Sequence, residues 1–143
     1  MHSPWLAASC AGLVLLACGR SIDDAGNVCL YPAGTVQEPY EQPESPEPVD
    51  FTADAPLRAT AHIGHSGGEE LRFRCTLTRD GDTIDLHTHY REPPGDPQDD
   101  LRSFSATCEL PGLPAGTYTL VFADEEHTLT VPSTVPPPCL GSF

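Results

Sequence analysis

The stretch LRFRCTL, residues 71–77, alternates between apolar and polar side chains at every position. In a β-strand such alternation puts the apolar side chains on one face and the polar ones on the other. A second stretch, FSATCEL at residues 104–110, shows the same alternation and also has its cysteine on the apolar face. We therefore predict that Cys75 and Cys108 form a disulfide at the centre of a small β-sandwich.

The composition also favours strands over helices. Glycine and proline contribute 12 and 16 of the 143 residues, and this favours short strands joined by many turns. Further alternating segments are found at residues 57–63, 83–90, 117–122 and 127–131, and turn sequences separate them. The predicted fold is all-β, a small antiparallel two-sheet sandwich that occupies residues 51–132.

One hairpin near the C-terminus resembles a known class of domain. The segment LPAGTYTL at residues 113–120 is followed by a turn and then by TLTV at residues 128–131. This block resembles the last hairpin of immunoglobulin-like and prealbumin-like domains of bacterial secreted proteins. The resemblance implies an immunoglobulin-like sandwich, and it implies no particular activity because such sandwiches have many functions.

The N-terminus predicts where the protein resides. Residues 5–17 are almost wholly apolar, a run too short to span a bilayer but suited to the core of a signal peptide. The run leads into LLACG at residues 15–19, which resembles the lipobox of bacterial lipoproteins. The resemblance implies that residues 1–17 are removed and that Cys18 carries a diacylglycerol. It also implies export and anchoring in the cell envelope, at the outer membrane or cell surface rather than the inner membrane.

The remaining cysteines support an exported domain. After loss of the leader and lipidation of Cys18, four are left, at Cys29, Cys75, Cys108 and Cys139. An even number in a small exported domain predicts disulfides. Three pairings are possible, and we favour Cys75–Cys108 with Cys29–Cys139 because two cysteines lie in strands and two lie near the chain ends. Zinc is a poorer alternative because no Cys-x-x-Cys spacing is present.

The segments that flank the predicted sandwich differ from it in composition. Residues 18–50 are acidic and rich in proline, and we expect them to form an extended tether with a short ordered segment at residues 29–32. The tail at residues 133–143 is expected to be held in place by Cys139.

The charge balance limits the class of partner. The formal net charge is −14, and all seven basic residues are arginine. Such a chain is poorly suited to binding nucleic acid or adhering electrostatically to anionic lipid. We expect a monomer without a cofactor that contacts the membrane through its lipid, with another envelope protein as the candidate partner.

A single motif suggests catalysis. GHSGG at residues 64–68 matches the G-x-S-x-G nucleophile elbow of α/β-hydrolases, in which a helix must follow the serine. Here the following residues continue as a strand, so we expect a glycine-rich loop and no enzymatic activity. A small serine hydrolase that uses Ser66 is the enzymatic alternative.

The histidines suggest a metal site. His87 and His89 lie on the same polar face of one predicted strand, and His62 lies on the polar face of another. If the two strands were neighbours, these three imidazoles could converge on zinc or copper. The alternative is that they are dispersed on a solvated sheet surface. The acidic segments at residues 95–100 and 124–126 could take Ca²⁺ through oxygen ligands, although neither has EF-hand spacing.

Overall fold

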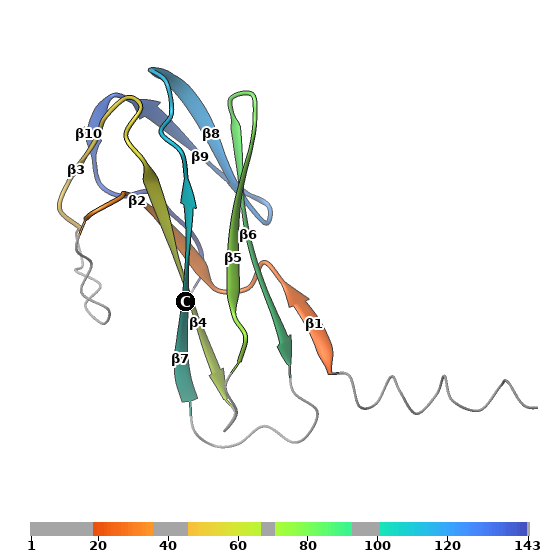
Figure 1. Cartoon of the computed structure of the whole chain (residues 1–143). Helices are drawn as coiled ribbons and strands as arrows, with labels where there is room; N and C mark the ends of the chain where they lie inside the picture. Colours follow the sequence, from red (N-terminus) through yellow and green to blue (C-terminus); the bar gives the residue numbers. More distant parts are fainter. Residues whose placement is uncertain (1–18, 36–45, 67–70, 93–100, 143) are drawn as a thin grey trace, which may run out of the picture.

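The computed structural model describes residues 19–35, 46–66, 71–92 and 101–142, and these form eleven strands and no helix. Nine of the strands make two sheets that pack face to face, and the other two form a short ribbon (Figure 1). The predicted all-β, two-sheet sandwich is therefore confirmed.

The four-stranded sheet is antiparallel throughout. Its order is β11 (Cys139–Gly141), β2 (Asn27–Pro32), β4 (Leu57–Ser66) and β7 (Leu101–Leu110). Strand β4 pairs with β7 along its whole length, because both strands have ten residues and alternate in phase.

The five-stranded sheet is built around β6 (Thr83–Glu92). Strand β5 (Arg74–Asp80) pairs along one side of β6. On the other side, β1 (Arg20–Asp23) pairs with the end of β6 and β8 (Gly116–Phe122) with its beginning, and β9 (Glu125–Val131) follows β8. The β6–β8 pair is parallel, so the sandwich that we predicted as antiparallel contains one parallel pair.

The folded part extends beyond residues 51–132 at both ends. Strands β1 and β2 come from the segment 18–50, so this part of the expected tether belongs to the two sheets. The short ribbon pairs β3 (Val49–Phe51) with β10 (Ser133–Val135), and β11 lies in the expected tail. Residues 36–45 of the expected tether lie outside the described residues.

The core forms where the apolar faces of the two sheets meet. Residues 71–77 alternate in burial as expected, although the paired strand begins only at Arg74. The most deeply buried core side chains are Val28, Leu30, Phe51, Leu57, Ala59, Ala61, Ile84, Leu86, Leu113, Leu120, Phe122, Leu129, Val131 and Leu140.

Both predicted disulfides are present. Cys75–Cys108 joins β5 to β7 and so links an edge of one sheet to an edge of the other. The expected position at the centre of the sandwich was wrong, because both strands lie at sheet edges and both cysteines are only partly buried. Cys29–Cys139 joins neighbouring strands β2 and β11, in which the two residues lie directly opposite one another.

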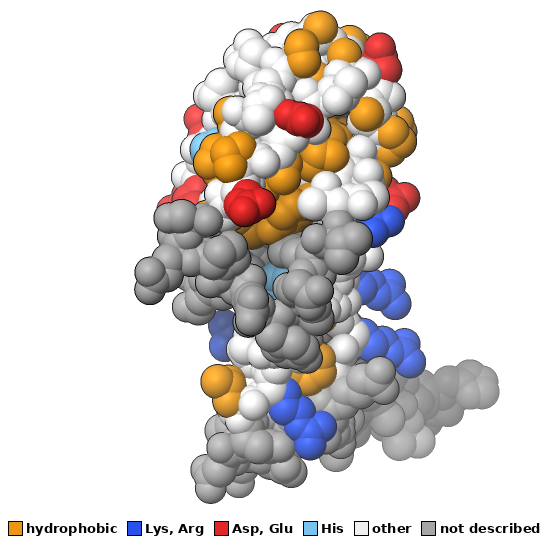
Figure 2. Space-filling view, turned by 90° about the vertical axis from the view of Figure 1, so that its left-hand side faces the viewer, with side chains coloured by type: hydrophobic (Ala, Val, Ile, Leu, Met, Phe, Trp, Pro, Cys, Tyr) orange, Lys and Arg blue, Asp and Glu red, His pale blue; other side chains and the backbone are white. Residues whose placement is uncertain are grey.

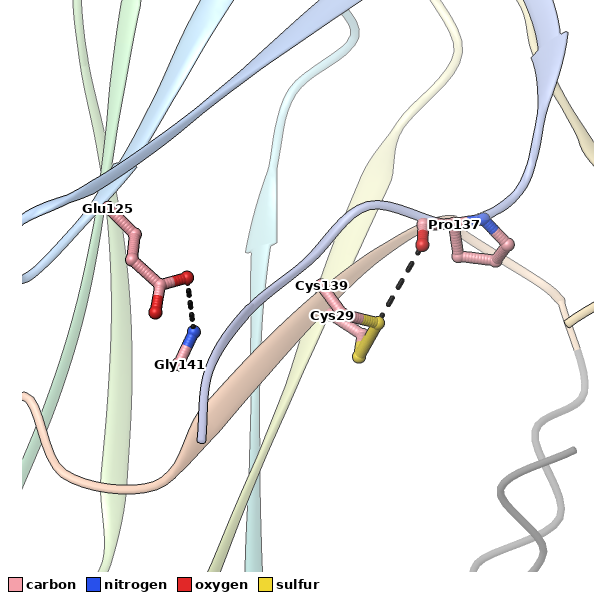
Figure 3. The surroundings of a disulfide bond; sticks show 5 residues. All are labelled: Cys29, Glu125, Pro137, Cys139 and Gly141. Atoms are coloured by element: carbon pink, nitrogen blue, oxygen red, sulfur yellow. Dashed lines mark hydrogen bonds between the residues drawn. A yellow bond between two sulfur atoms is a disulfide. The ribbon is translucent and has the colours of Figure 1, made fainter. Parts of the chain in front are cut away.

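A polar contact supports the opposite flank of the sandwich. There β11 and β9 contact each other across the two sheets, and the Gly141 backbone N–H donates to Glu125 Oε2 at 3.0 Å (Figure 3). One flank is therefore closed by a covalent bond and the other by a hydrogen bond. The strand β11 that closes this second flank is itself held by Cys29–Cys139.

Two contacts fix the loop between β7 and β8. The Asp54 backbone N–H donates to the Leu113 carbonyl at 2.8 Å, and a side chain on Gly112 would overlap the Asp54 carbonyl group. The Tyr118 hydroxyl donates to the Pro114 carbonyl at 2.6 Å. The loop therefore depends on a residue without a side chain and on one buried tyrosine.

Candidate functional site

Four polar side chains gather on the outer face of the five-stranded sheet. His87 and His89 project from β6, since the alternate residues of that strand face the core. His89 Nδ1 lies 2.7 Å from Asp23 Oδ1, and His87 Nδ1 lies 3.2 Å from Asp24 Oδ1. We call His87, His89, Asp23 and Asp24 the His–Asp cluster.

The backbone of β1 explains how two consecutive carboxylates reach one face. Asp23 is the last residue of β1 and lies opposite His89 in the antiparallel register. Successive residues of a strand point to opposite faces, but Asp24 has left the strand and has φ of 54°. Aspartate is one of the few residues that adopt this left-handed conformation readily. The turn at Asp24 therefore brings its carboxylate to the same histidine-bearing face.

Further hydrogen bonds hold Asp24 in this position. Its backbone N–H donates to the Thr88 carbonyl at 2.9 Å, and its Oδ1 accepts the Thr88 backbone N–H at 3.3 Å. The buried Thr88 hydroxyl donates to the Ala25 carbonyl at 2.8 Å. The turn after β1 is thus fixed to β6 by both backbone and side chains.

This arrangement selects one form of each imidazole. A carboxylate at Nδ1 accepts a hydrogen bond from the N–H of that nitrogen, and in the neutral ring this leaves the lone pair on Nε2. The side chains of His87 and His89 are 53% and 47% exposed. In each half-exposed imidazole, the aspartate therefore fixes Nδ1. Nε2 is left to act as an acceptor.

The structure does not bring His62 to this cluster. His62 lies on β4 in the four-stranded sheet, opposite Asn27 and Ser105, whereas His87 and His89 lie in the five-stranded sheet. The strands that we expected to be neighbours are in different sheets. Within the described ranges, no group of three or more His, Cys, Asp or Glu side chains is arranged to hold a metal ion.

His62 instead lines a hollow of about 190 Å³ on the outer face of the four-stranded sheet. Burial lowers the pKa of His62 from its ordinary value. Arg58, in the same hollow, donates from Nη2 to Glu109 Oε1 at 2.8 Å. The hollow is smaller than the roughly 300–1,000 Å³ of typical small-molecule sites. Its other lining residues are Tyr31, Pro32, Thr35, Thr60, Ser105 and Thr107.

The other sequence candidates have the following positions. Ser66 is the last residue of β4, and the described chain resumes at residue 71 and leads into β5. Residues 67–68 of the glycine-rich motif and the acidic segment 95–100 lie outside the described residues. Within segment 124–126, Glu125 binds the backbone of β11.

The N-terminal predictions fall outside the described residues, which begin at residue 19. They include the signal peptide and the lipidation of Cys18. Over the described ranges, the chain has no helix of sufficient length and hydrophobicity to cross a membrane.

Charge is distributed unevenly over the surface. In the face shown in Figure 2, acidic side chains lie mainly in the upper part and arginines in the lower part. The lower end is where β1 begins and where β4 ends opposite the start of β7 (Figure 1). Exposed arginines of the β1 and β5 segments include Arg20, Arg72 and Arg74. Among the described residues, arginine side chains therefore gather at this end.

Sequence reasoning did not identify Asp23 and Asp24 as site residues. From sequence, Asp23-Asp24-Ala25-Gly26 was expected to be part of the polar tether. Only the pairing of β1 with β6, more than 60 residues later, reveals the contacts of the two aspartates. The one local signal is the consecutive pair of acids next to a turn.

No family model, curated protein or solved structure matches the chain. Its class is therefore defined by its own residues. It is a disulfide-bonded all-β sandwich with two histidine–aspartate pairs on one outer face.

Proposed function

We propose that the chain is an exported, lipid-anchored β-sandwich that serves as a non-enzymatic binding or structural module of the cell envelope. The observation that carries this proposal is that the four cysteines after Cys18 are all paired, as Cys29–Cys139 and Cys75–Cys108. Disulfides of this kind persist in oxidising compartments and are rare in the cytosol.

The position of the first strand supports the proposed cleavage. β1 begins at Arg20, two residues after Cys18, and none of the described strands includes an earlier residue. Removal of residues 1–17 would therefore leave every described strand intact. A lipid on Cys18 would be separated from β1 by about 7 Å of extended chain, so the sandwich would lie close to the bilayer.

Mass spectrometry of the mature protein from the membrane fraction tests the anchor. We expect an N-terminal Cys18 with the mass of a diacylglyceryl group, and we expect Cys18→Ser to lose this mass and to remain unprocessed. Cys10→Ser is the matched control, because Cys10 lies in the proposed leader and its loss should change neither result. An unmodified thiol at Cys18 in the mature protein would refute the anchor.

A serine-reactive fluorophosphonate probe tests the non-enzymatic part of the proposal. We expect no labelling of the folded protein, since the nucleophile elbow of hydrolases requires a strand-to-helix turn. Labelling that disappears in Ser66→Ala would contradict this expectation and favour the small-hydrolase alternative.

A further inference from the structure

The His–Asp cluster does more than is needed to attach β1 to β6. The backbone pairing of β1 with β6 and the Asp23–His89 contact already join the two strands. The second pair requires Asp24 to adopt a left-handed conformation, with φ of 54°. The Asp24 backbone N–H already donates to the Thr88 carbonyl, so this turn does not depend on the Asp24–His87 contact. The cluster therefore warrants a functional explanation.

We propose that the cluster is a binding site for a divalent transition-metal ion, Cu²⁺ or Zn²⁺, with Nε2 of His87 and Nε2 of His89 as the protein ligands. Imidazole nitrogen is a preferred ligand for both ions. The proposal replaces the expected three-histidine site, because His62 lies in the other sheet.

The spacing of the two histidines suits a shared ion. Residues i and i+2 of a strand lie on the same face, about 6.6–6.8 Å apart along the strand. Two nitrogens that each lie about 2.0–2.1 Å from a tetrahedral ion are about 3.3 Å apart. The two Nε2 atoms must therefore approach each other by about 3 Å. For both aspartate contacts to be kept, each ring has to supply its share of this movement by pivoting about its Nδ1, which stays at the carboxylate.

The aspartates supply what metal-binding histidines usually have around them. Such a histidine nearly always donates its other ring N–H to a carboxylate or carbonyl, which fixes the ring and makes the ligating nitrogen more basic. Asp23 and Asp24 occupy this position on His89 and His87, at 2.7 and 3.2 Å from Nδ1. Both imidazoles are thus oriented with Nε2 as the available donor of a lone pair.

Charged side chains of both signs surround the cluster. Arg74 lies opposite His89 on β5, and Arg91 is two residues further along β6 on the same face. Their two positive charges oppose a bound cation, and the carboxylates of Asp23 and Asp24 offset them. With only two protein ligands, the remaining positions on the ion are filled by water. We therefore expect an exchangeable ion with micromolar affinity, and Cu²⁺ to bind more tightly than Zn²⁺.

Calorimetric titration of the metal-free, disulfide-intact full chain with Cu²⁺ and then Zn²⁺ tests the site. We expect one ion per chain, at least tenfold weaker binding in His87→Gln or His89→Gln, and no binding in the double variant. His127→Gln is the matched control, because His127 is also an exposed histidine on a strand of the same sheet. The affinity of His127→Gln for each ion should equal that of the unaltered protein.

The surrounding residues give a second, graded test. Asp23→Asn should weaken binding about tenfold, as loss of a carboxylate partner typically does, and Arg74→Gln should strengthen it. Melting curves of each variant check that the fold is retained.

Electron paramagnetic resonance of the Cu²⁺ complex of the unaltered protein tests the ligand set without any substitution. Hyperfine coupling to two imidazole nitrogens is expected. The proposal is overturned if the unaltered protein does not bind either ion, if the double histidine variant binds as tightly as the unaltered protein, or if the spectrum shows no coordinated nitrogen.

Discussion

The two disulfides should contribute unequally to stability, and the difference can be worked out from the chain. We consider Cys75→Ala/Cys108→Ala and Cys29→Ala/Cys139→Ala as separate double variants. A cross-link stabilises the folded state mainly by reducing the entropy of the unfolded chain, and it does so more for a longer loop. The cysteines are separated by 33 residues in the first pair and by 110 in the second.

The loops are nested, and this changes the estimate for both bonds. Loss of Cys75–Cys108 while Cys29–Cys139 remains merges loops of 33 and 110 − 33 = 77 residues into one loop of 110, and should cost about 3.4 kcal/mol in the chain-entropy relation. When Cys75–Cys108 remains, it shortens the outer loop to 110 − 33 = 77 residues. Loss of Cys29–Cys139 should then cost about 4.5 kcal/mol. Either loss is a large fraction of the roughly 5–15 kcal/mol by which domains are stable.

Urea unfolding followed by circular dichroism measures both costs. The Cys29/Cys139 variant should be the less stable by about 1 kcal/mol. Both variants should show larger m-values because their unfolded chains expose more surface. Removal of buried Cys29 adds a small cavity, which acts in the same direction. If the Cys75/Cys108 variant were equally or less stable, loop entropy could not be the main source of the difference, and the contacts at the β5–β7 flank would have to account for the result.

Three further predictions concern single residues. Gly112→Ala should lower the free energy of unfolding in urea by several kcal/mol, because its Cβ would overlap the backbone of Asp54. Gly116→Ala is the control and should cost about 1 kcal/mol or less, because its Cβ would meet only a side chain, at 3.7 Å. Similar costs for the two variants would contradict the clash at Gly112. Burial lowers the pKa of His62 below 6.5, so the unfolded chain binds more protons. The contribution of neutral His62 to the free energy of unfolding should be complete above about pH 6.5 and lost as the pH falls through the lowered pKa. His62→Gln should therefore flatten the pH profile of the melting temperature. Tyr118→Phe should cost about 1 kcal/mol through loss of the hydrogen bond to Pro114, and an unchanged melting temperature would argue against that bond.

The strands that could be predicted from the sequence are those with one buried face and one solvated face. Strands β4, β6 and β8 alternate between apolar and polar residues, and the alternation could be read directly. Strand β2 does not alternate, because its first four residues, 27–30, are all buried. Strand β1 is short and mostly polar, and only partly buried Ile22 marks its inner face. Its place in the sheet depends on β6, which no local pattern in β1 could reveal.

The candidate site was predicted in part for the same reason. Alternation placed His87 and His89 on one polar face, and the structure has them there. It could not show whether β4 and β6 are neighbours, since strand order depends on how the chain crosses between sheets. Asp23 was missed because it reaches His89 only through the pairing of β1 with β6, and Asp24 because it reaches His87 through its left-handed backbone.

If Cys18 carries the proposed lipid, the start of β1 at Arg20 limits how far from the bilayer the protein could act. With lipid on Cys18, only one residue separates the anchored cysteine from β1. The sandwich could therefore not move away from the bilayer as a domain on a long flexible linker does. A ten-residue strand such as β6 spans about 33 Å, and any partner would have to approach the bilayer to roughly that distance. The acidic, proline-rich residues of segment 36–48 lie between β2 and β3. They therefore follow the first two strands and cannot act as a spacer between lipid and fold.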